Sequence, residues 1–343
     1  MALKKFGETP SGDIVWLAEL KAGDVVVEII SFGATIHRVL APDRKGKKAD
    51  VVLGKDTFEG YMSRGAPSGA VIGRVANRIK NHAFKLNGKR FVLEANENKN
   101  TLHSAGGNYA RRNFAVVDSG SAHVRLAARD LGEAGFPGEI AVEVCYTLEE
   151  DGTLLIEYTA IPTTDTPINL TNHVYFNLAG QETKNIYAQT MQINADFYTL
   201  SDANNITTGE IRTVKKTPFD FTSPRNLGEA IAELEASGDK RHGFDQNFVL
   251  RSDGWKHIAE AYDEKSGRAL AVYTDLPGVQ LYVGNNIRED TEGKKGAKYG
   301  RHSGFCLETQ FFPDAINKAH FPGGIAYAGE IFATATAYRF YTK

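Results

Sequence analysis

The stretch CYTLEEDGTLLIEYTA, residues 145–160, carries the clearest fold signal in the chain. Its two ends, Cys145–Leu148 and Thr153–Ala160, are rich in aliphatic, aromatic and β-branched residues, and Glu149–Gly152 between them is acidic and ends in glycine. Two β-forming runs joined by a short polar segment with a glycine are typical of an antiparallel hairpin. We therefore expect two neighbouring antiparallel strands over these residues.

The same pattern recurs along the chain. Asn87-Gly88 separates Phe84–Leu86 from Lys89–Leu93, and this dipeptide suits a type I′ hairpin turn because both central residues need a positive φ. Two further hairpins and four further strands are expected: Val116–Asp118 with His123–Ala127, His257–Tyr262 with Ala269–Thr274, and the strands Asp24–Ser31, Ile186–Phe197, Val279–Val283 and Ile331–Tyr341.

A helical pattern is clear only over Leu227–Ala236, where Leu227, Ala230, Ile231 and Leu234 follow helical spacing. Many short strands with almost no helices between them favour an antiparallel sandwich over βαβ units. Neither a shift in composition nor a linker divides the sequence. We predict an all-β fold, a large antiparallel β-sandwich with few short helices, formed by residues 1–343 as a single domain.

Composition excludes several classes of protein. The 343 residues are 42% hydrophobic, and 40 Lys and Arg against 42 Asp and Glu give a formal net charge of −2. This balance provides no long-range attraction to nucleic acid or anionic membranes. The basic stretch with Lys294, Lys295, Lys298 and Arg301 is interpreted as a solvated surface. Phosphate-binding loops, zinc-binding motifs and serine nucleophile elbows are all absent from the sequence.

Cysteine usage and the N-terminus bear on location. Cys145 and Cys306 are too few for a disulfide framework, and each lies in an apolar run, so we expect buried free thiols. The N-terminal residues show no apolar signal-peptide segment, and no apolar run is long enough to span a membrane. A cytoplasmic protein is expected, although a processed secreted form would look the same. The sequence does not indicate an oligomeric state.

Five polar residues lie in segments where burial is expensive without a purpose. His103 precedes a glycine-rich loop, and His173 lies among asparagines and aromatic residues. Glu308 follows the apolar run Gly304–Leu307, so desolvation is expected to raise its pKa and make it a usable base near neutral pH. Asp245 lies between aromatic residues, and Arg78 stands in a largely apolar segment. Residue types alone leave a structural role open for each of them.

Seven segments together resemble the aldose 1-epimerase (galactose mutarotase) family, in the family's order and spacing, from about Gly33 to Tyr341. Two of them are at least twelve residues long, which makes the resemblance specific. The segments are GRVANRI (73–79), TLH (101–103), GFPG (135–138), NLTNHVYFNLAG (169–180), GFDQNF (243–248), PGVQLYVGN (277–285) and GFCLETQFFPDAIN (304–317).

The resemblance implies a galactose mutarotase-like supersandwich and an isomerase that interconverts the α and β anomers of free aldoses such as glucose and galactose, with no cofactor and no metal. Glu308 resembles the base that takes the proton from the anomeric hydroxyl, and His173 resembles the acid that protonates the ring oxygen. The remaining site residues resemble sugar-binding groups: Asn77, Arg78, His103, Tyr175, Asp245 and Gln280.

The chemistry is consistent with these roles. Mutarotation already proceeds in water, so positioned acid and base groups, each contributing about 10²–10⁴-fold, suffice without a metal or a covalent intermediate. His173 should start as an imidazolium to act as the acid, so we expect a nearby carboxylate to hold its pKa close to the operating pH. Two departures leave the preferred sugar open: Ser104–Ala110 replaces the family's common glycine and Gly-Phe-Asp segment, and Val174 stands where serine is frequent.

Three alternatives are kept. A glycoside hydrolase would use a pair of carboxylates, for which Glu308 and Asp245 are candidates, but it gives His173 no role. A relative acting on hexose 6-phosphates would need an additional basic cluster near the pocket. A non-catalytic carbohydrate-binding protein would need Arg78, Asp245 and Gln280 but no acid–base pair. A small-molecule monosaccharide substrate is the expected partner, without nucleic acid or membrane.

Overall fold

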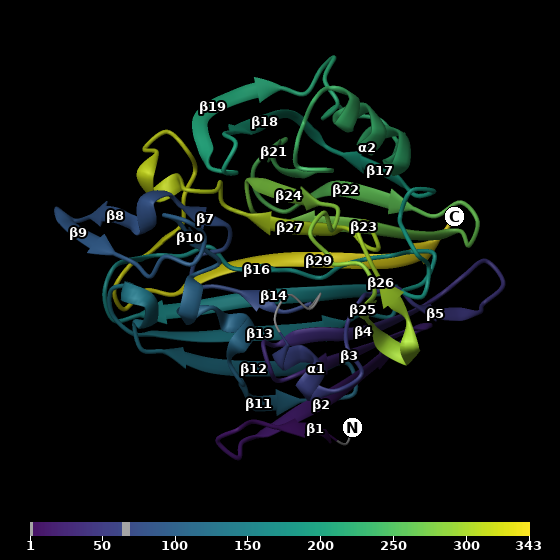
Figure 1. Ribbon diagram of the computed structural model, residues 1–343. Coiled ribbons are helices and arrows are strands. Elements are labelled where there is room, and N and C mark those ends of the chain that lie inside the picture. The colour runs from purple at the N-terminus through teal and green to yellow at the C-terminus, as the bar shows by residue number, and fades with distance from the viewer. Residues whose placement is uncertain (1–2, 64–68) are drawn as a thin grey trace.

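The computed structural model describes residues 3–63 and 69–343, and within them strands dominate (Figure 1). The two α-helices of this part are short, α1 (Phe58–Met62) and α2 (Leu227–Ala236). Among these described residues, every strand pair is antiparallel apart from one isolated parallel bridge between Val75 and Asn169. The predicted all-β antiparallel sandwich is confirmed.

The largest sheet has nine strands and crosses the whole molecule (Figure 1). The hairpin predicted over residues 145–160 forms the third and fourth strands of this sheet, where Leu148 pairs with Leu154. In spatial order the strands are β11 (Ala115–Ser119), β12 (His123–Asp130), β13 (Ile140–Leu148), β14 (Thr153–Pro162), β29 (Phe332–Thr342), β23 (Arg268–Thr274), β22 (Lys256–Tyr262), β17 (Thr190–Ile193) and β20 (Arg225–Asn226).

Two five-stranded sheets pack against the large one. Strands β2 and β4 of the first lie against β12, β13 and β29. In the second, β27 is linked to β29 by the Tyr338 hydroxyl, which donates to the Leu307 carbonyl at 3.2 Å. The first sheet contains β1 (Lys4–Glu8), β2 (Ile14–Ala22), β3 (Val25–Ile30), β4 (Thr35–Pro42) and β5 (Lys48–Asp50); the second contains β19 (Thr207–Thr213), β18 (Ala195–Ser201), β21 (Asp245–Leu250), β24 (Gly278–Tyr282) and β27 (Cys306–Gln310).

Short paired segments and 3₁₀ turns connect the sheets. The pairs are β6 (Val71–Ile72) with β16 (Thr171–Asn172), β7 (Arg78–Ile79) with β10 (Thr101–Leu102), β8 (Ala83–Leu86) with β9 (Lys89–Val92), β15 (Thr166–Pro167) with β28 (Ile325–Ala326), and β25 (Thr291–Glu292) with β26 (Lys298–Tyr299). The turns are η1 (Lys80–His82), η2 (Ala105–Gly107), η3 (Tyr109–Arg111), η4 (Glu133–Gly135), η5 (Lys294–Gly296) and η6 (Ala315–Asn317).

The four predicted hairpins form, and helix α2 has the predicted bounds. Its N-cap Asn226 accepts a hydrogen bond from the Glu229 backbone, and the predicted apolar stripe is buried. The continuous strand predicted over Ile186–Phe197 is wrong. Its first residues form a turn, and the remainder divides at Asn194 between β17 of the nine-stranded sheet and β18 of a five-stranded sheet. Apolar alternation does not reveal that the chain changes sheets.

Two expectations about individual residues need correction. Lys294 is not solvated: its ammonium is fully buried, 2.6 Å from the Asp50 carboxylate, and donates to the His37 carbonyl at 2.7 Å. The charge pattern concealed this because the acid comes from β5, far away in sequence. Cys306 is buried as expected, whereas Cys145 is only half-buried. Within the described residues, no helix is both long and apolar enough to cross a membrane.

The buried ion pair yields a stability prediction. Lys294→Met leaves the Asp50 carboxylate without its closest cation in a desolvated position, and breaking such a pair costs about 3–5 kcal/mol. The free energy of unfolding, measured by urea denaturation, should fall by this amount. Lys298→Met is the matched control because Lys298 pairs with Glu292 at an exposed site, where the loss should stay within about 1 kcal/mol. Equal losses in the two variants would contradict the prediction.

Candidate active site

A pocket of about 130 Å³ lies where the second five-stranded sheet meets the loops that follow β6, β10 and β16. A cavity of about 150 Å³ accommodates a ring the size of benzene, so this pocket has the scale of a single sugar ring that remains partly exposed. The pocket contains every site residue predicted from the sequence except Gln280. It is lined by Asn77, Arg78, Leu102, His103, His173, Tyr175, Asp245, Tyr282, Asn286 and Glu308.

The sheet supplies one wall of the pocket through its register. Across β21, β24 and β27, Asp245 pairs with Tyr282 and Tyr282 with Cys306. In the next row of the same face, Gln280 pairs with Glu308. Because side chains alternate between the two faces of a strand, the intervening residues, such as Leu281 and Leu307, point into the core.

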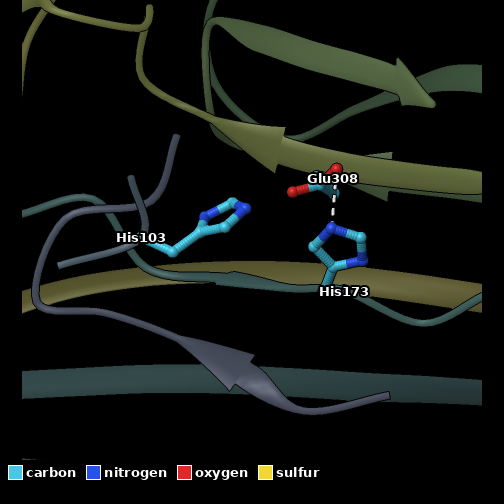
Figure 2. Close-up of side chains that lie close together, drawn as sticks. All are labelled: His103, His173 and Glu308. Carbon is cyan, nitrogen blue, oxygen red and sulfur yellow. Dashed lines mark ion pairs between the residues drawn. The ribbon is translucent and has the colours of Figure 1, made fainter. Parts of the chain in front are cut away.

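The opposite wall comes from the short paired segments. His173 directly follows β16, and its backbone N–H donates to the Ala70 carbonyl at 2.9 Å. Arg78 of β7 pairs with Leu102 of β10, and His103 follows that strand. These two small sheets bring residues that are far apart in sequence to the Glu308 side of β27, as Figure 2 shows for both histidines.

The central contact joins His173 and Glu308. The Nε2 atom of His173 lies 3.6 Å from Oε1 of Glu308 (Figure 2), and the two side chains are 15% and 3% exposed. Burial raises the pKa of the Glu308 carboxyl, an effect that nearby Asp245 reinforces and that His173 and Arg78 oppose. The raised pKa agrees with the sequence-based expectation. Among the described residues, the buried Oε2 of Glu308 has no hydrogen-bond partner, so no neighbouring donor holds this carboxylate oxygen.

His103 is held as a neutral hydrogen-bond donor. Desolvation lowers the pKa of His103 well below its usual value, and the nearby His173 and Arg78 lower it further. Its Nδ1 accepts a hydrogen bond from the Asn77 backbone N–H at 3.1 Å. The single proton of the neutral ring is therefore on Nε2, which makes Nε2–H the available donor.

Arg78 is oriented by a residue that sequence reasoning missed. Its Nε and Nη2 bind the two carboxylate oxygens of Glu97 at 2.6 and 2.7 Å. Such a fork geometry fixes the guanidinium plane and leaves Nη1 for a ligand. Burial disfavours the charge, but Glu97, together with Asp245 and Glu308, raises the pKa of Arg78. Glu97 could not be found from the sequence because nothing in its local pattern distinguishes it from other acidic loop residues.

Gln280 is tied into the sheet instead of lining the pocket. Its Nε2 donates to Oδ1 of Asp245 at 2.7 Å, and its Oε1 accepts from Gln310 at 3.1 Å. Gln310 also donates to Asn247 at 2.9 Å. Asp245 receives a further bond from Asn205 at 3.3 Å. These amides hold the Asp245 carboxylate in place in the wall of the pocket.

The aromatic part of the pocket was only partly anticipated. Tyr175 and the unpredicted Tyr282 both contact His173, with ring centroids 5.0 and 6.0 Å from its imidazole, and their own centroids are 6.1 Å apart. The Tyr282 hydroxyl accepts from the backbone N–H of Asn286 at 3.0 Å. Tyr282 is two residues after Gln280, so strand alternation places both side chains on the same face. This spacing could have identified Tyr282 from the sequence.

The same groups include a possible metal-ligand set. One ligand atom each from His103, His173 and Glu308 lies within 4.8 Å of the others. Two histidines with one carboxylate can bind zinc or iron. Here, however, the Arg78 guanidinium acts electrostatically on both His103 and Glu308, and a fixed positive charge disfavours a second cation. The set therefore fits proton transfer better than metal binding.

Comparisons with known proteins identify the family of this chain. The family model described as aldose 1-epimerase matches residues 17–339. Galactose mutarotase of Homo sapiens is 42% identical over 339 residues, covering 98% of this chain and 97% of that protein. Aldose 1-epimerase of Escherichia coli (strain K12) is 32% identical over 323 residues, 92% of each chain. A solved GalM/aldose epimerase homologue from C. elegans superposes with a TM-score of 0.89 at 30% identity, covering 96% of this chain and 99% of that one.

A galactose mutarotase-like β-sandwich whose polar pocket contains a buried carboxylate–imidazole pair defines a carbohydrate isomerase. The chain belongs to the aldose 1-epimerase family. It is an aldose 1-epimerase, an isomerase that acts on a monosaccharide. The family resemblance deduced from the sequence is confirmed.

The Glu97–Arg78 pair generates the first prediction about the site. Glu97→Ala removes two charge-assisted hydrogen bonds and frees the guanidinium to rotate, so kcat/KM for the sugar should fall by about 10- to 100-fold, the equivalent of about 1.5–3 kcal/mol. Steady-state polarimetry measures this loss. Glu210→Ala, which breaks the exposed Glu210–Arg212 pair, should leave kcat/KM unchanged. Equal values for both variants would show that Glu97 does not orient Arg78.

The raised pKa of Glu308 generates a second prediction. Between the ordinary glutamate pKa and this raised value, the folded protein binds more protons than the unfolded chain, so stability falls as pH rises through that window. Glu308→Gln has no carboxylate to ionise in this buried position, so it should be more stable than the unmodified protein at pH 7. The difference should shrink as pH falls below the window. Denaturation at several pH values tests this, with exposed Glu157→Gln as control; a less stable Glu308→Gln at pH 7 contradicts it.

Proposed function

We propose that Glu308 and His173 are the acid–base pair of this epimerase, with free aldoses of the glucose and galactose type as substrates. The observation that carries the proposal is the contact of 3.6 Å between His173 Nε2 and Glu308 Oε1 at the base of a pocket of sugar-ring size. The unpartnered Oε2 of Glu308 supports its role as the proton acceptor.

Proton transfer proceeds in two symmetric halves. Glu308 takes the proton from the anomeric hydroxyl while His173 Nε2–H protonates the ring oxygen, and the C1–O5 bond breaks to give the open-chain aldehyde. The C1–C2 bond then rotates and presents the other carbonyl face. His173 recovers a proton from the C5 hydroxyl as that oxygen attacks C1, and Glu308 returns its proton to the carbonyl oxygen. Each group ends in its starting state, so no metal, cofactor or covalent intermediate is required.

The other pocket residues bind and orient the sugar. His103 Nε2–H and Arg78 Nη1 are donors to ring and hydroxyl oxygens, and the Asp245 carboxylate accepts from hydroxyls. Tyr175 presents an aromatic surface and a hydroxyl. Asn77 acts on the sugar through its neighbours, since its side-chain oxygen accepts from the Arg78 backbone at 2.9 Å. These assignments include the six binding residues proposed from the sequence, with Gln280 acting through Asp245.

A free sugar fits the pocket better than a sugar phosphate. Arg78 is the only lysine or arginine among the described residues that line it, and Glu97 already neutralises its charge. A phosphate group would need unpaired cations. A purely carbohydrate-binding protein is disfavoured by Glu308, because a buried carboxylate with a raised pKa contributes to proton transfer but weakens stability.

Two further proposals concern the domain organisation and the location of the protein. A single domain over residues 1–343 is supported by one apolar core cluster that contains Val27, Ile156 and Leu307, from all three large sheets. Unfolding in one cooperative transition, monitored by both fluorescence and circular dichroism, tests it. A cytoplasmic location is supported by the two free cysteines.

Polarimetry on freshly dissolved α-D-glucose and α-D-galactose tests the acid–base pair. Glu308→Gln and His173→Asn should each lower kcat by about 10²–10⁴-fold, while KM changes much less. Because Glu308 must be ionised and its pKa is raised, the acid limb of kcat/KM should lie above the value of about 4.3 for a free glutamate. Activity should survive incubation with EDTA. Retention of activity by either variant would refute the assignment.

A further inference from the structure

Both ring nitrogens of His173 contact side chains of strand β27. Nε2 lies 3.6 Å from Oε1 of Glu308, and Nδ1 lies 3.4 Å from Sγ of Cys306. Both partners are on β27, two residues apart and therefore on the same face of the strand. In Figure 2 the dashed line joins one ring nitrogen of His173 to Glu308, and the second ring nitrogen points away from Glu308. The imidazole thus lies beside β27, and each of its nitrogens has one polar partner on that strand.

The chemistry of Cys306 suits this position. The side chain is completely buried, and burial, with Glu308 and Asp245 nearby, raises the pKa of the thiol well above its usual value. The thiol is therefore neutral. A neutral thiol is a weak acceptor and a weak donor, whereas most functional histidines orient their second nitrogen with a carbonyl or carboxylate. Among the described residues, no other group forms a hydrogen bond with His173 Nδ1.

We propose that Cys306 is a positioning residue that accepts a hydrogen bond from His173 Nδ1–H, so that the exchangeable proton of the imidazole is confined to Nε2. The inference rests on the proposed acid role of His173. With Nδ1–H engaged by sulfur in both protonation states, Nε2 alone gains and loses the proton, and it faces Glu308 and the pocket. The ring cannot turn over without losing both contacts.

The weakness of the sulfur contact is useful to the reaction. His173 must release its proton in one half of the cycle and recover it in the other, so its two protonation states need similar free energies. A carboxylate at position 306 would stabilise the imidazolium and hold the proton, and an apolar side chain would leave Nδ1–H unpaired in a buried place. A thiol avoids both effects. The remaining groups that face His173 are His103, Tyr175 and Tyr282, with Arg78 and Asp245 farther away.

The test compares Cys306→Ala with Cys306→Ser. Loss of the acceptor in Cys306→Ala should lower kcat by about tenfold with KM within twofold, and it should move the alkaline limb of the kcat profile to lower pH. Cys306→Ser retains an acceptor that is stronger than sulfur, so it should keep kcat within about threefold and move that limb to higher pH. Cys145→Ala and Cys145→Ser are matched controls at a half-buried thiol remote from the pocket, and neither should change kcat or its pH profile.

A spectroscopic measurement separates this inference from the proposed function. Nitrogen NMR of ¹⁵N-histidine-labelled protein, with His173→Asn to assign the signal, should show a protonated Nδ1 throughout the titration in the unmodified protein and in Cys306→Ser, and a mixture of tautomers in Cys306→Ala. An unprotonated Nδ1 in the unmodified protein, or unchanged kcat and pH profile in Cys306→Ala, overturns the inference. Full activity of His173→Asn would instead overturn the acid role, whatever the tautomer.

Discussion

The site depends on the register of three antiparallel strands. Tyr282 pairs with Cys306 and Gln280 with Glu308, and this pairing determines which residues of β24 and β27 face the pocket. Since side chains alternate along a strand, a slip of one residue would turn Leu307 toward the pocket and bury Glu308 in the apolar core. The apolar residues that alternate with the site residues prevent such a slip, because Leu281 and Leu307 are completely buried. The hydrophobic core thereby positions the residues for which we propose acid–base roles.

The charges of the pocket are balanced in pairs that differ in purpose. Arg78 is matched by Glu97 in a bidentate contact, which makes the guanidinium a fixed donor. Glu308 has His173 as its nearest charge partner, but at 3.6 Å, with one oxygen left unpartnered. The first pair resembles a structural ion pair and the second does not. An enzyme that moves protons needs such a loosely paired group beside firmly fixed ones, since a fully satisfied carboxylate would be a poor base.

Most of the fold and most of the pocket residues could be predicted from the sequence, for physical reasons that differ between elements. Hairpins such as 145–160 combine turn chemistry with β-forming runs, so they are recognisable locally. Glu308 could be identified because an acid in an apolar run is unusual. By contrast, Lys294 was misread because its partner Asp50 lies on a distant strand, and Ile186–Phe197 was misread because alternation does not indicate which sheet a residue joins. Glu97 was missed because nothing in its local pattern distinguishes it from other acidic loop residues.

Backbone strain next to the pocket has a specific use. Asn77 and His103 both have a positive φ, 60° and 50°, which is an uncommon conformation for residues other than glycine. The two residues stabilise each other: the His103 N–H donates to the Asn77 carbonyl at 2.8 Å, and the Asn77 N–H donates to His103 Nδ1. This reciprocal pair compensates for the strain and fixes the tautomer at the same time. This is consistent with the proposed roles, in which His103 donates a hydrogen bond to the sugar without titrating while His173 and Glu308 exchange protons.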